Sequence, residues 1–511
     1  MKRIMSIYES CKMPIRICFF GFILIAFGFL IQNESVNIFY TFTSKYLLMF
    51  AQGCLMLGNT IIINLPLIFM VYIVCKKANS GVPIALALIG YFAYLVTTTL
   101  FSSQALSPYA YASGVGINAI IDMSGVTKYP LETGMIGAFI VAYITRYSFI
   151  RSRHRTSHSL LGFLNRDSAA IIYNICFCTF AGMIVSYVFP YLYSYLSTLI
   201  TYISRDLSDP LRMGLYGALD RALSILGLGN YIRYPFWYTA MGGSYQTLSG
   251  QSIVGGVNIW NYTKDIMTTY SGAGRFITPY YVINMFIAPA LYMGILFSMT
   301  DKQERSHFMF FFILAAIGSF VVGNPLPLEL MMLFTAPFLL LCYLGIVAVV
   351  FAYLSSAGIY LGSSIGSNLN TITAMPGTFP DFIINLRSVI HFDALLQIFL
   401  VGLAAALITY IVAYVYYRFL AFNLINSGKD QAIVNATVEA MGGYDNIENV
   451  GSGFNRVNFA LRNNELVSVD RLQSLGVNRI TETRTGISID FGSSSCIISR
   501  MVKAVLKELG R

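Results

Sequence analysis

Long uncharged runs of apolar residues constrain this chain more than any other feature. Ile17 to Asn33 and Tyr46 to Cys75 contain no acidic or basic side chain, and comparable runs follow at intervals as far as Tyr417. About 20 apolar residues in a helix cross the hydrocarbon core of a bilayer, where every backbone polar group must be satisfied internally. Only 11% of the 511 residues are charged, against about a quarter in a soluble domain. The chain is therefore predicted to be a polytopic α-helical membrane protein.

Basic residues at the ends of these runs predict the orientation. They occur before the first run in residues 2–16, after the second at Lys76 and Lys77, and after the fourth in residues 151–155. Because cytoplasmic loops are rich in Lys and Arg, both ends of the chain are predicted to lie in the cytoplasm. The formal net charge of +10 is explained by this placement, and no nucleic-acid partner is expected.

We expect about ten transmembrane helices together with re-entrant hairpins. Tyr46 to Cys75 is interpreted as one span, and Ala169 to Ile203 is longer than a bilayer, so that it should tilt or break near Pro190. The segment from Ser204 to Phe276 mixes charges, glycines and both tryptophans. It is expected to form amphipathic, half-inserted segments that line a cavity.

The composition changes after Arg418. Alternating patterns at Arg456 to Leu461 and Gly486 to Phe491 predict strands, and Ser499 to Leu509 predicts an amphipathic helix. We expect a membrane domain over residues 1–422, a linker over 423–430, and a small cytoplasmic α+β domain over 431–511.

A proline-rich stretch, Gly323 to Pro337, contains the most unusual charge of the chain. Between His307 and Pro380, Glu329 is the only acidic or basic residue. An ionisable group at membrane depth is costly unless it faces a partner or a cavity, and Pro325 and Pro327 exclude a regular helix interior. The stretch is interpreted as a re-entrant, substrate-facing element. A loop between two spans, with Glu329 solvated, is the alternative.

The eight cysteines include no CxxC pair and no spacing typical of metal ligands. Most lie inside apolar runs, where reduced, packed side chains are expected. Neither a metal nor a cofactor is predicted.

Several motifs in a defined order point to one family. They are LETGMIGAF at 131–139, LYGALDRAL at 215–223, YPFW at 234–237, MGGSYQTLSGQSIVGG at 241–256, LFTAP at 333–337, YYRFLAFNL at 416–424 and VEAMGGYDNIENV at 438–450. Over nearly its whole length the chain resembles a sugar permease of the bacterial phosphoenolpyruvate-dependent phosphotransferase system, in the glucose, maltose and N-acetylglucosamine superfamily, with membrane domain C followed by cytoplasmic domain B. The motif at 241–256 resembles the maltose/glucose branch of that superfamily.

The resemblance implies a protein of the bacterial cytoplasmic membrane in which domain C binds a sugar at the membrane midplane and forms a homodimer. It also implies that domain B, phosphorylated on a cysteine, passes the phosphoryl group to the sugar. A low-pKa thiolate is suited to accept and donate that group.

Three positions depart from the family pattern. The phosphocysteine position is Gly453, which has no nucleophile; the first glutamate of the re-entrant motif is Leu326, with Glu329 as the second; and the family's His-His pair is Gly229 and Asn230. Phosphoryl transfer depends on positioning and charge stabilisation. We therefore expect that this chain's own B domain does not phosphorylate sugar, so that no catalytic residue is assigned and enzyme activity is left open.

Polar groups near the family's sugar site are the candidate substrate-binding residues. They are Asn230, Arg233, Asn324 and Glu329, with Glu132 as an addition and Trp237 as an aromatic wall. Topology or interface charges are the alternative for Arg233 and Glu132, and helix caps or turns are the alternative for Asn230 and Asn324.

Two functional classes follow from the resemblance. The first is a sugar permease that has lost coupled phosphorylation, or that obtains it from another chain's B domain. The second is a sugar sensor or regulatory subunit that pairs with an intact permease, with phosphotransferase system proteins or with a cytoplasmic regulator. A paralogue with no activity is a third possibility.

Overall fold

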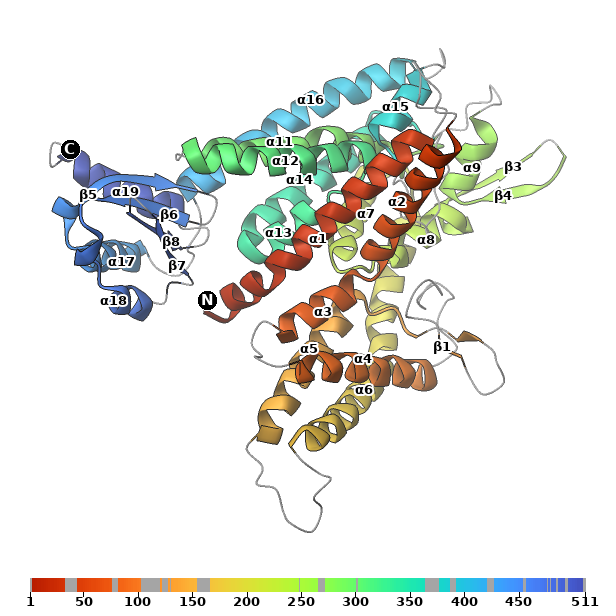
Figure 1. Ribbon diagram of the computed structural model, residues 1–511. Coiled ribbons are helices and arrows are strands. Elements are labelled where there is room, and N and C mark those ends of the chain that lie inside the picture. The colour runs from red at the N-terminus through yellow and green to blue at the C-terminus, as the bar shows by residue number, and fades with distance from the viewer. Residues whose placement is uncertain are drawn as a thin grey trace, which may run out of the picture.

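The computed structural model (Figure 1) separates the protein into a long helical region and a small C-terminal sheet-and-helix unit. It describes residues 2–32, 44–75, 81–102, 120–121, 127–128, 130–153, 166–247, 249–264, 272–299, 302–363, 376–386, 392–420, 427–453, 456–475, 477, 479–483, 486–491 and 495–508.

Among the residues that the structure describes, the first part of the helical region consists of six helices, with two short strands between the fourth and the fifth. In chain order these elements are α1 (Lys2–Gln32), α2 (Lys45–Ile63), α3 (Leu65–Cys75), α4 (Val82–Phe101), β1 (Ile120–Ile121), β2 (Thr127–Lys128), α5 (Gly134–Arg153) and α6 (Arg166–Ser204).

Short elements follow, and then longer helices return. The elements are α7 (Pro210–Ile225), α8 (Asn230–Tyr238), η4 (Ala240–Gly242), β3 (Ser244–Gln246), β4 (Ser252–Val254), α9 (Gly256–Thr263), α10 (Thr278–Val282), η5 (Ile283–Ile287), α11 (Ala288–Ser298), α12 (Lys302–Val322), α13 (Leu326–Thr335), α14 (Pro337–Ser356), α15 (Phe379–Leu386), α16 (Phe392–Val415) and η7 (Tyr416–Leu420).

Among the described residues, seven helical segments are long and apolar enough to cross a membrane. They are Met13–Gln32, Lys45–Ile63, Val82–Phe101, Asp167–Ser204, Thr278–Ser298, Pro337–Ser356 and Phe392–Arg418. Shorter apolar helices occupy Leu65–Cys75, Met309–Val322 and Leu326–Thr335. The polytopic helical class is thus confirmed, whereas the expected count of ten spans stays a prediction.

The structure corrects one expectation about the early spans and leaves only the tilt of another. The run from Tyr46 to Cys75 is not one helix, because Pro66 has no N–H to continue the ladder and the chain turns at Asn64, whose side-chain amide donates to the Thr60 carbonyl at 2.9 Å. No break occurs at Pro190, since α6 runs through it as one helix of 39 residues. The helix α6 packs along α4 and α5.

The proline-rich stretch forms a short helix between two turns. Gly323 adopts a positive φ of 75°, Pro325 caps α13, and Pro327 lies in its first turn, where a missing N–H costs nothing. The ten residues of α13 are too few to cross a bilayer. The two prolines thus lie outside the helix interior, as expected, and the interpretation of the stretch as a re-entrant, substrate-facing element stays a prediction.

The C-terminal unit contains a four-stranded antiparallel sheet in the order β5-β6-β8-β7. The predicted strands correspond to β6 (Arg456–Leu461) and β8 (Gly486–Asp490), and the amphipathic helix is α19 (Ser495–Glu508), which begins four residues earlier than expected. The other elements are α17 (Ser427–Ala440), η8 (Tyr444–Asn446), β5 (Ile447–Ser452), η9 (Asn464–Leu466), α18 (Val469–Ser474) and β7 (Ile480–Thr483).

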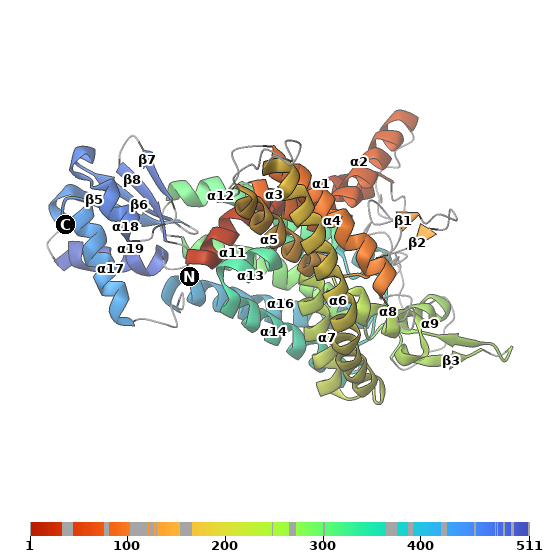
Figure 2. The ribbon, with the colours of Figure 1, turned by 90° about the horizontal axis from the view of Figure 1, so that it is seen from below.

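One face of this sheet builds a separate hydrophobic core. Val457 and Phe459 of β6 pack with Ile498 and Val502 of α19, and α17 and α18 complete the cluster. Outside this core, α19 contacts η7 at the end of the helical region. Figure 1 and Figure 2 both place the N-terminal end of α1 near this unit, and α9 with the β3–β4 hairpin at the opposite end of the molecule. The domain limits 1–422, 423–430 and 431–511 remain a prediction.

Candidate functional site

Helix α7 carries two adjacent opposite charges, Asp220 and Arg221, into the largest hydrophobic core. The helix begins where the Asp209 carboxylate accepts a hydrogen bond from the Leu211 N–H at 2.9 Å, with Pro210 at the first helical position. Gly214 and Gly217 let α7 approach α14 closely, because a Cβ at Gly217 would lie 2.2 Å from the Phe351 ring. The sequence of α7 therefore places its charged pair beside α13 and α14.

Arg221 and Glu329 form a bidentate ion pair between α7 and α13. The Nε and Nη2 atoms of Arg221 donate to the two carboxylate oxygens of Glu329, both at 2.8 Å. Tyr343 of α14 donates a third hydrogen bond to Glu329 Oε1 at 2.7 Å. Glu329 is 0% exposed and Arg221 is 1% exposed. The one charge of the proline-rich stretch is thus enclosed in protein, and the alternative of a solvated loop does not apply.

A second ion pair joins α7 to α8. Arg233 donates from Nε to Asp220 Oδ1 at 2.6 Å and from Nη2 to Asp220 Oδ2 at 3.2 Å. The same Nη2 also donates to Ser224 Oγ at 2.7 Å, and Tyr280 of α10 donates to Asp220 Oδ2 at 2.6 Å. We call Asp220, Arg221, Arg233 and Glu329 the charged network.

The charged network has four charges that sum to zero. Bidentate guanidinium–carboxylate pairs are among the strongest hydrogen-bonded contacts, but desolvating four charges offsets most of that gain. Removing a single partner leaves a buried charge uncompensated, at a cost of about 3–5 kcal/mol. Buried ionisable groups of this kind in a membrane protein are functional-site candidates.

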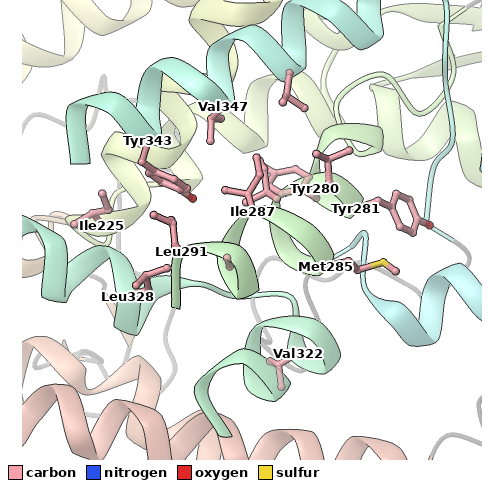
Figure 3. Packing of buried hydrophobic residues seen from close by; sticks show 14 of the residues in the cluster. Ile225, Tyr280, Tyr281, Met285, Ile287, Leu291, Val322, Leu328, Tyr343 and Val347 are labelled. Carbon is pink, nitrogen blue, oxygen red and sulfur yellow. The ribbon is translucent and has the colours of Figure 1, made fainter. Parts of the chain in front are cut away.

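Aromatic side chains enclose the charged network. Trp237 of α8 is buried and donates from Nε1 to the Tyr216 hydroxyl at 3.0 Å. The Arg233 guanidinium lies 5.8 Å from the ring centres of Trp237 and Tyr280. In Figure 3, Tyr343 and Leu328 project into the same space from α14 and α13. The environment combines convergent polar groups with an aromatic wall.

The structure brings together three of the six predicted binding residues. Glu329 and Arg233 belong to the charged network, and Trp237 lies against it. Asn324 is in the turn before α13, where its Oδ1 accepts from the Leu326 N–H at 3.1 Å, as expected for a turn residue. Asn230 is exposed at the start of α8 and does not belong to the network. A binding role for any of them remains a prediction.

Glu132 belongs to a different place. With Asn64 and Tyr91 it lines a small cavity of about 40 Å³ between the α2–α3 turn and α4. Its backbone carbonyl contacts α8 by accepting a hydrogen bond from the Tyr231 hydroxyl at 2.9 Å. Burial raises the pKa of Glu132 to about 7, although the Gly134 N–H lowers it in part. This carboxyl therefore changes charge near neutral pH.

Sequence reasoning missed Asp220, Arg221, Tyr280 and Tyr343 as members of the site. A signal was present for the first two, because LYGALDRAL places two adjacent charges inside an otherwise apolar motif. No local signal identifies the tyrosines, which lie in apolar runs among many other tyrosines.

The positions that depart from the family pattern lie next to the network or in the C-terminal unit. Leu326 is partly buried and packs against the main core. A Cβ at Gly229 would lie 2.6 Å from Ser224 Oγ and 3.4 Å from the Arg233 guanidinium. The Ser224 and Arg233 side chains therefore occupy the space that a larger residue at position 229 would need. Gly453 follows β5, and its N–H donates to the Arg456 carbonyl at 2.8 Å in the β5–β6 turn.

Fold and site together define a polytopic membrane protein that contains an enclosed, charge-balanced polar centre. The family model described as "Phosphotransferase system, EIIC" matches residues 11–349, which is more than half of the chain. The chain belongs to this family and is a membrane permease component of the phosphotransferase system, with a sugar as its substrate.

A curated relative supports the same assignment. The chain is 26% identical over 529 aligned residues to the PTS system glucoside-specific EIICBA component of Staphylococcus carnosus. The match covers 99% of this chain and 73% of that protein.

Proposed function

We propose that this chain is a permease for glucose, maltose or a related glucoside that moves its sugar without phosphorylating it. The observation that carries the proposal is the charged network, two bidentate pairs shielded from solvent inside the family's membrane domain. The glucoside specificity in the name of the Staphylococcus carnosus relative supports this class of sugar.

The chemistry of the network suits a sugar. Each sugar hydroxyl both donates and accepts, so it can accept from Arg221 or Arg233 and donate to Glu329 or Asp220. Tyr343 and Tyr280 already make neutral hydroxyl contacts to these carboxylates at 2.7 and 2.6 Å. A sugar hydroxyl can take the place of either phenol without leaving a carboxylate unsatisfied.

Loss of phosphorylation is inferred from three positions in two units of the chain. Gly453 supplies no thiolate, Leu326 supplies no carboxylate, and Gly229 supplies no imidazole. Each of these changes removes a group that phosphoryl transfer needs for positioning or charge stabilisation. The chain would therefore act as a facilitator, or depend on a B domain from another chain.

Uptake into proteoliposomes that contain only the purified chain tests this function. Radiolabelled glucose, maltose and a methyl glucoside are offered outside, and the internal product is analysed for phosphate. We expect saturable uptake of unmodified sugar that Glu329→Gln reduces at least about tenfold, since a charged hydrogen-bonding group is lost. Sugar phosphate formed after addition of the general phosphocarriers would refute the loss of phosphorylation.

A sensor or regulatory subunit is the second candidate. The C-terminal unit keeps a complete hydrophobic core around its sheet although Gly453 lacks a nucleophile, which favours a docking role for this unit. Sugar binding measured by calorimetry, together with no uptake into proteoliposomes, would favour the sensor over the permease.

We also propose that both termini are cytoplasmic and that the protein is a homodimer. The N-terminal end of α1 and the C-terminal unit lie at the same end of the molecule in both views (Figures 1 and 2), as a shared compartment requires. Protease accessibility of terminal tags in oriented vesicles checks the orientation, and light scattering of the detergent-corrected mass checks the dimer.

A further inference from the structure

A second cavity, distinct from the charged network, lies at the end of the helical region farthest from the C-terminal unit. Its volume is about 280 Å³, and it is formed by the α6–α7 loop, the ends of the β3–β4 hairpin, α9 and the segment before α10. Figure 1 and Figure 2 both show α9 and the hairpin at this end. The volume is close to the lower limit for small-molecule sites.

The mouth of the cavity is polar and exposed, and its floor is buried. Arg205, Asp206 and Ser208 at the mouth are exposed, whereas Gly256, Ile259 and Ala273 at the floor are buried. A ligand therefore meets charged and hydroxyl groups first and an apolar surface beneath them.

Local hydrogen bonds hold the polar groups of the mouth in place. Asp206 Oδ1 accepts from the Ser208 N–H at 2.9 Å and from the Ser208 hydroxyl at 2.5 Å, and these bonds lower the pKa of Asp206. Arg275 donates to the Leu207 carbonyl at 2.5 Å and to the Gly272 carbonyl at 3.1 Å, which ties the loop to the segment before α10. The carboxylate of Asp206 and the guanidinium groups of Arg205 and Arg275 thus belong to the lining of one cavity.

This mixture suits a polyhydroxyl ligand. The lining holds the carboxylate of Asp206 beside the guanidinium groups of Arg205 and Arg275, so it offers both hydrogen-bond acceptors and donors to a ligand. Hydroxyl groups that both donate and accept satisfy Asp206 and Arg205 together, and the apolar floor suits the face of a sugar ring.

A continuous set of buried aromatic rings connects the floor of this cavity to the charged network. A Cβ at Gly256 would lie 2.7 Å from the Phe276 ring, so the cavity floor touches Phe276. The Phe276 ring centre is 5.0 Å from that of Tyr216, which lies 5.6 Å from Phe351, and Phe351 lies 6.1 Å from Tyr280, whose hydroxyl binds Asp220. These rings therefore lie between the cavity and the charged network, and they contact both.

We propose that this cavity is a second carbohydrate site, an outer vestibule in which the sugar binds before the aromatic rings move and admit it to the charged network. This inference rests on the proposed sugar-permease function, and it adds a site, its residues and an order of binding to it.

The two tryptophans of the chain allow each site to be observed separately. Trp260 lies next to Ile259 on α9, whereas Trp237 lies against Arg233 of the network. In the Trp237→Phe variant of the full chain, in lipid nanodiscs, the remaining Trp260, which directly follows the lining residue Ile259 and packs on Gly362, reports on changes at the cavity floor. We expect maltose to change its emission saturably, and the change to persist when Glu329→Gln is added.

Vestibule variants give the decisive comparison. Asp206→Ala and Arg205→Ala should each weaken the apparent affinity measured at Trp260 by about tenfold, the effect of losing one charged hydrogen-bonding group. Asp393→Ala, an exposed aspartate at the start of α16, is the matched control and should leave the affinity unchanged.

Four results would overturn the vestibule. The first is that maltose does not change the Trp260 emission. The second and third are that the change is lost with Glu329→Gln, or is unaffected by Asp206→Ala. The fourth is that inorganic phosphate changes the emission and maltose does not. The Trp260→Phe variant, in which Trp237 reports on the network, separates the two proposals. A response of Trp237 without a response of Trp260 would remove the vestibule and leave the permease function standing.

Discussion

At the scale of single residues, the contribution of the Arg221–Glu329 ion pair to stability can be measured separately from its contribution to sugar uptake. Glu329→Gln leaves the buried guanidinium without a charged partner, and we expect the free energy of unfolding to fall by about 3–5 kcal/mol. The double variant Arg221→Met with Glu329→Met replaces both charges by apolar groups and should recover most of that loss. Unfolding in detergent measures stability, and sugar uptake measures function.

Recovery of stability without recovery of uptake is the expected outcome for the double variant. Glu448→Gln serves as the control, because Glu448 and Arg462 are both 57% exposed and 3.9 Å apart. A surface pair of this kind contributes about 0–1 kcal/mol. Full uptake by the double variant would show that the Arg221–Glu329 pair is structural only.

The carboxyl group of Glu132 predicts a dependence of stability on pH. Its folded pKa of about 7 is above its ordinary value of 4.5, because burial disfavours the charged form. The folded state therefore binds more protons than the unfolded state between these values, and the contribution of Glu132 to stability falls as pH rises from 4.5 through 7.

Comparison of the wild type with Glu132→Gln isolates this effect. The thermal midpoint of the wild type should fall relative to that of the variant between pH 5 and pH 8. Parallel pH profiles for the two proteins would contradict the assigned environment of Glu132.

At the scale of elements, the close contact of α7 with α14 positions the charged network. We expect Gly217→Ala to lower stability, because its Cβ would lie 2.2 Å from a Phe351 ring that is fully buried and must shift. Overpacking of this kind costs about 1–3 kcal/mol. The displaced Phe351 should also weaken sugar uptake.

Gly345→Ala on the facing helix is the matched control. A Cβ there meets no atom within 4 Å, so the substitution should raise stability by about 0.5–1 kcal/mol through the higher helix propensity of alanine. Equal effects of the two substitutions on the unfolding midpoint would argue against close packing of α7 on α14.

At the scale of the whole molecule, all members of the charged network belong to the helical region. They lie on α7, α8 and α13, and none comes from the C-terminal unit. A chain that ends after residue 426 should therefore retain uptake of unmodified sugar. Loss of uptake with an unchanged unfolding midpoint would show that the C-terminal unit takes part in transport.

The sequence predicts elements better than it predicts the site. Apolar runs without charges lead to the spans, and the two-residue alternation at Arg456 to Leu461 leads to β6, because burial dictates both patterns. Glu329 is identifiable as a buried charge for the same reason. Its partner Arg221 lies 108 positions away, and only packing of α7 on α13 and α14 brings the two together. No local rule predicts the continuity of α6 through Pro190 either.

The charge balance of the network has an electrical consequence. If Asp220, Arg221, Arg233 and Glu329 move together with a bound neutral sugar, their charges sum to zero and the membrane potential does no work on them. One uncompensated charge would be driven by about 2.3 kcal/mol per 100 mV. Sugar uptake by this protein should therefore proceed at the same rate in vesicles held at opposite potentials, and Glu329→Gln, which leaves one net positive charge, should make any residual uptake sensitive to voltage.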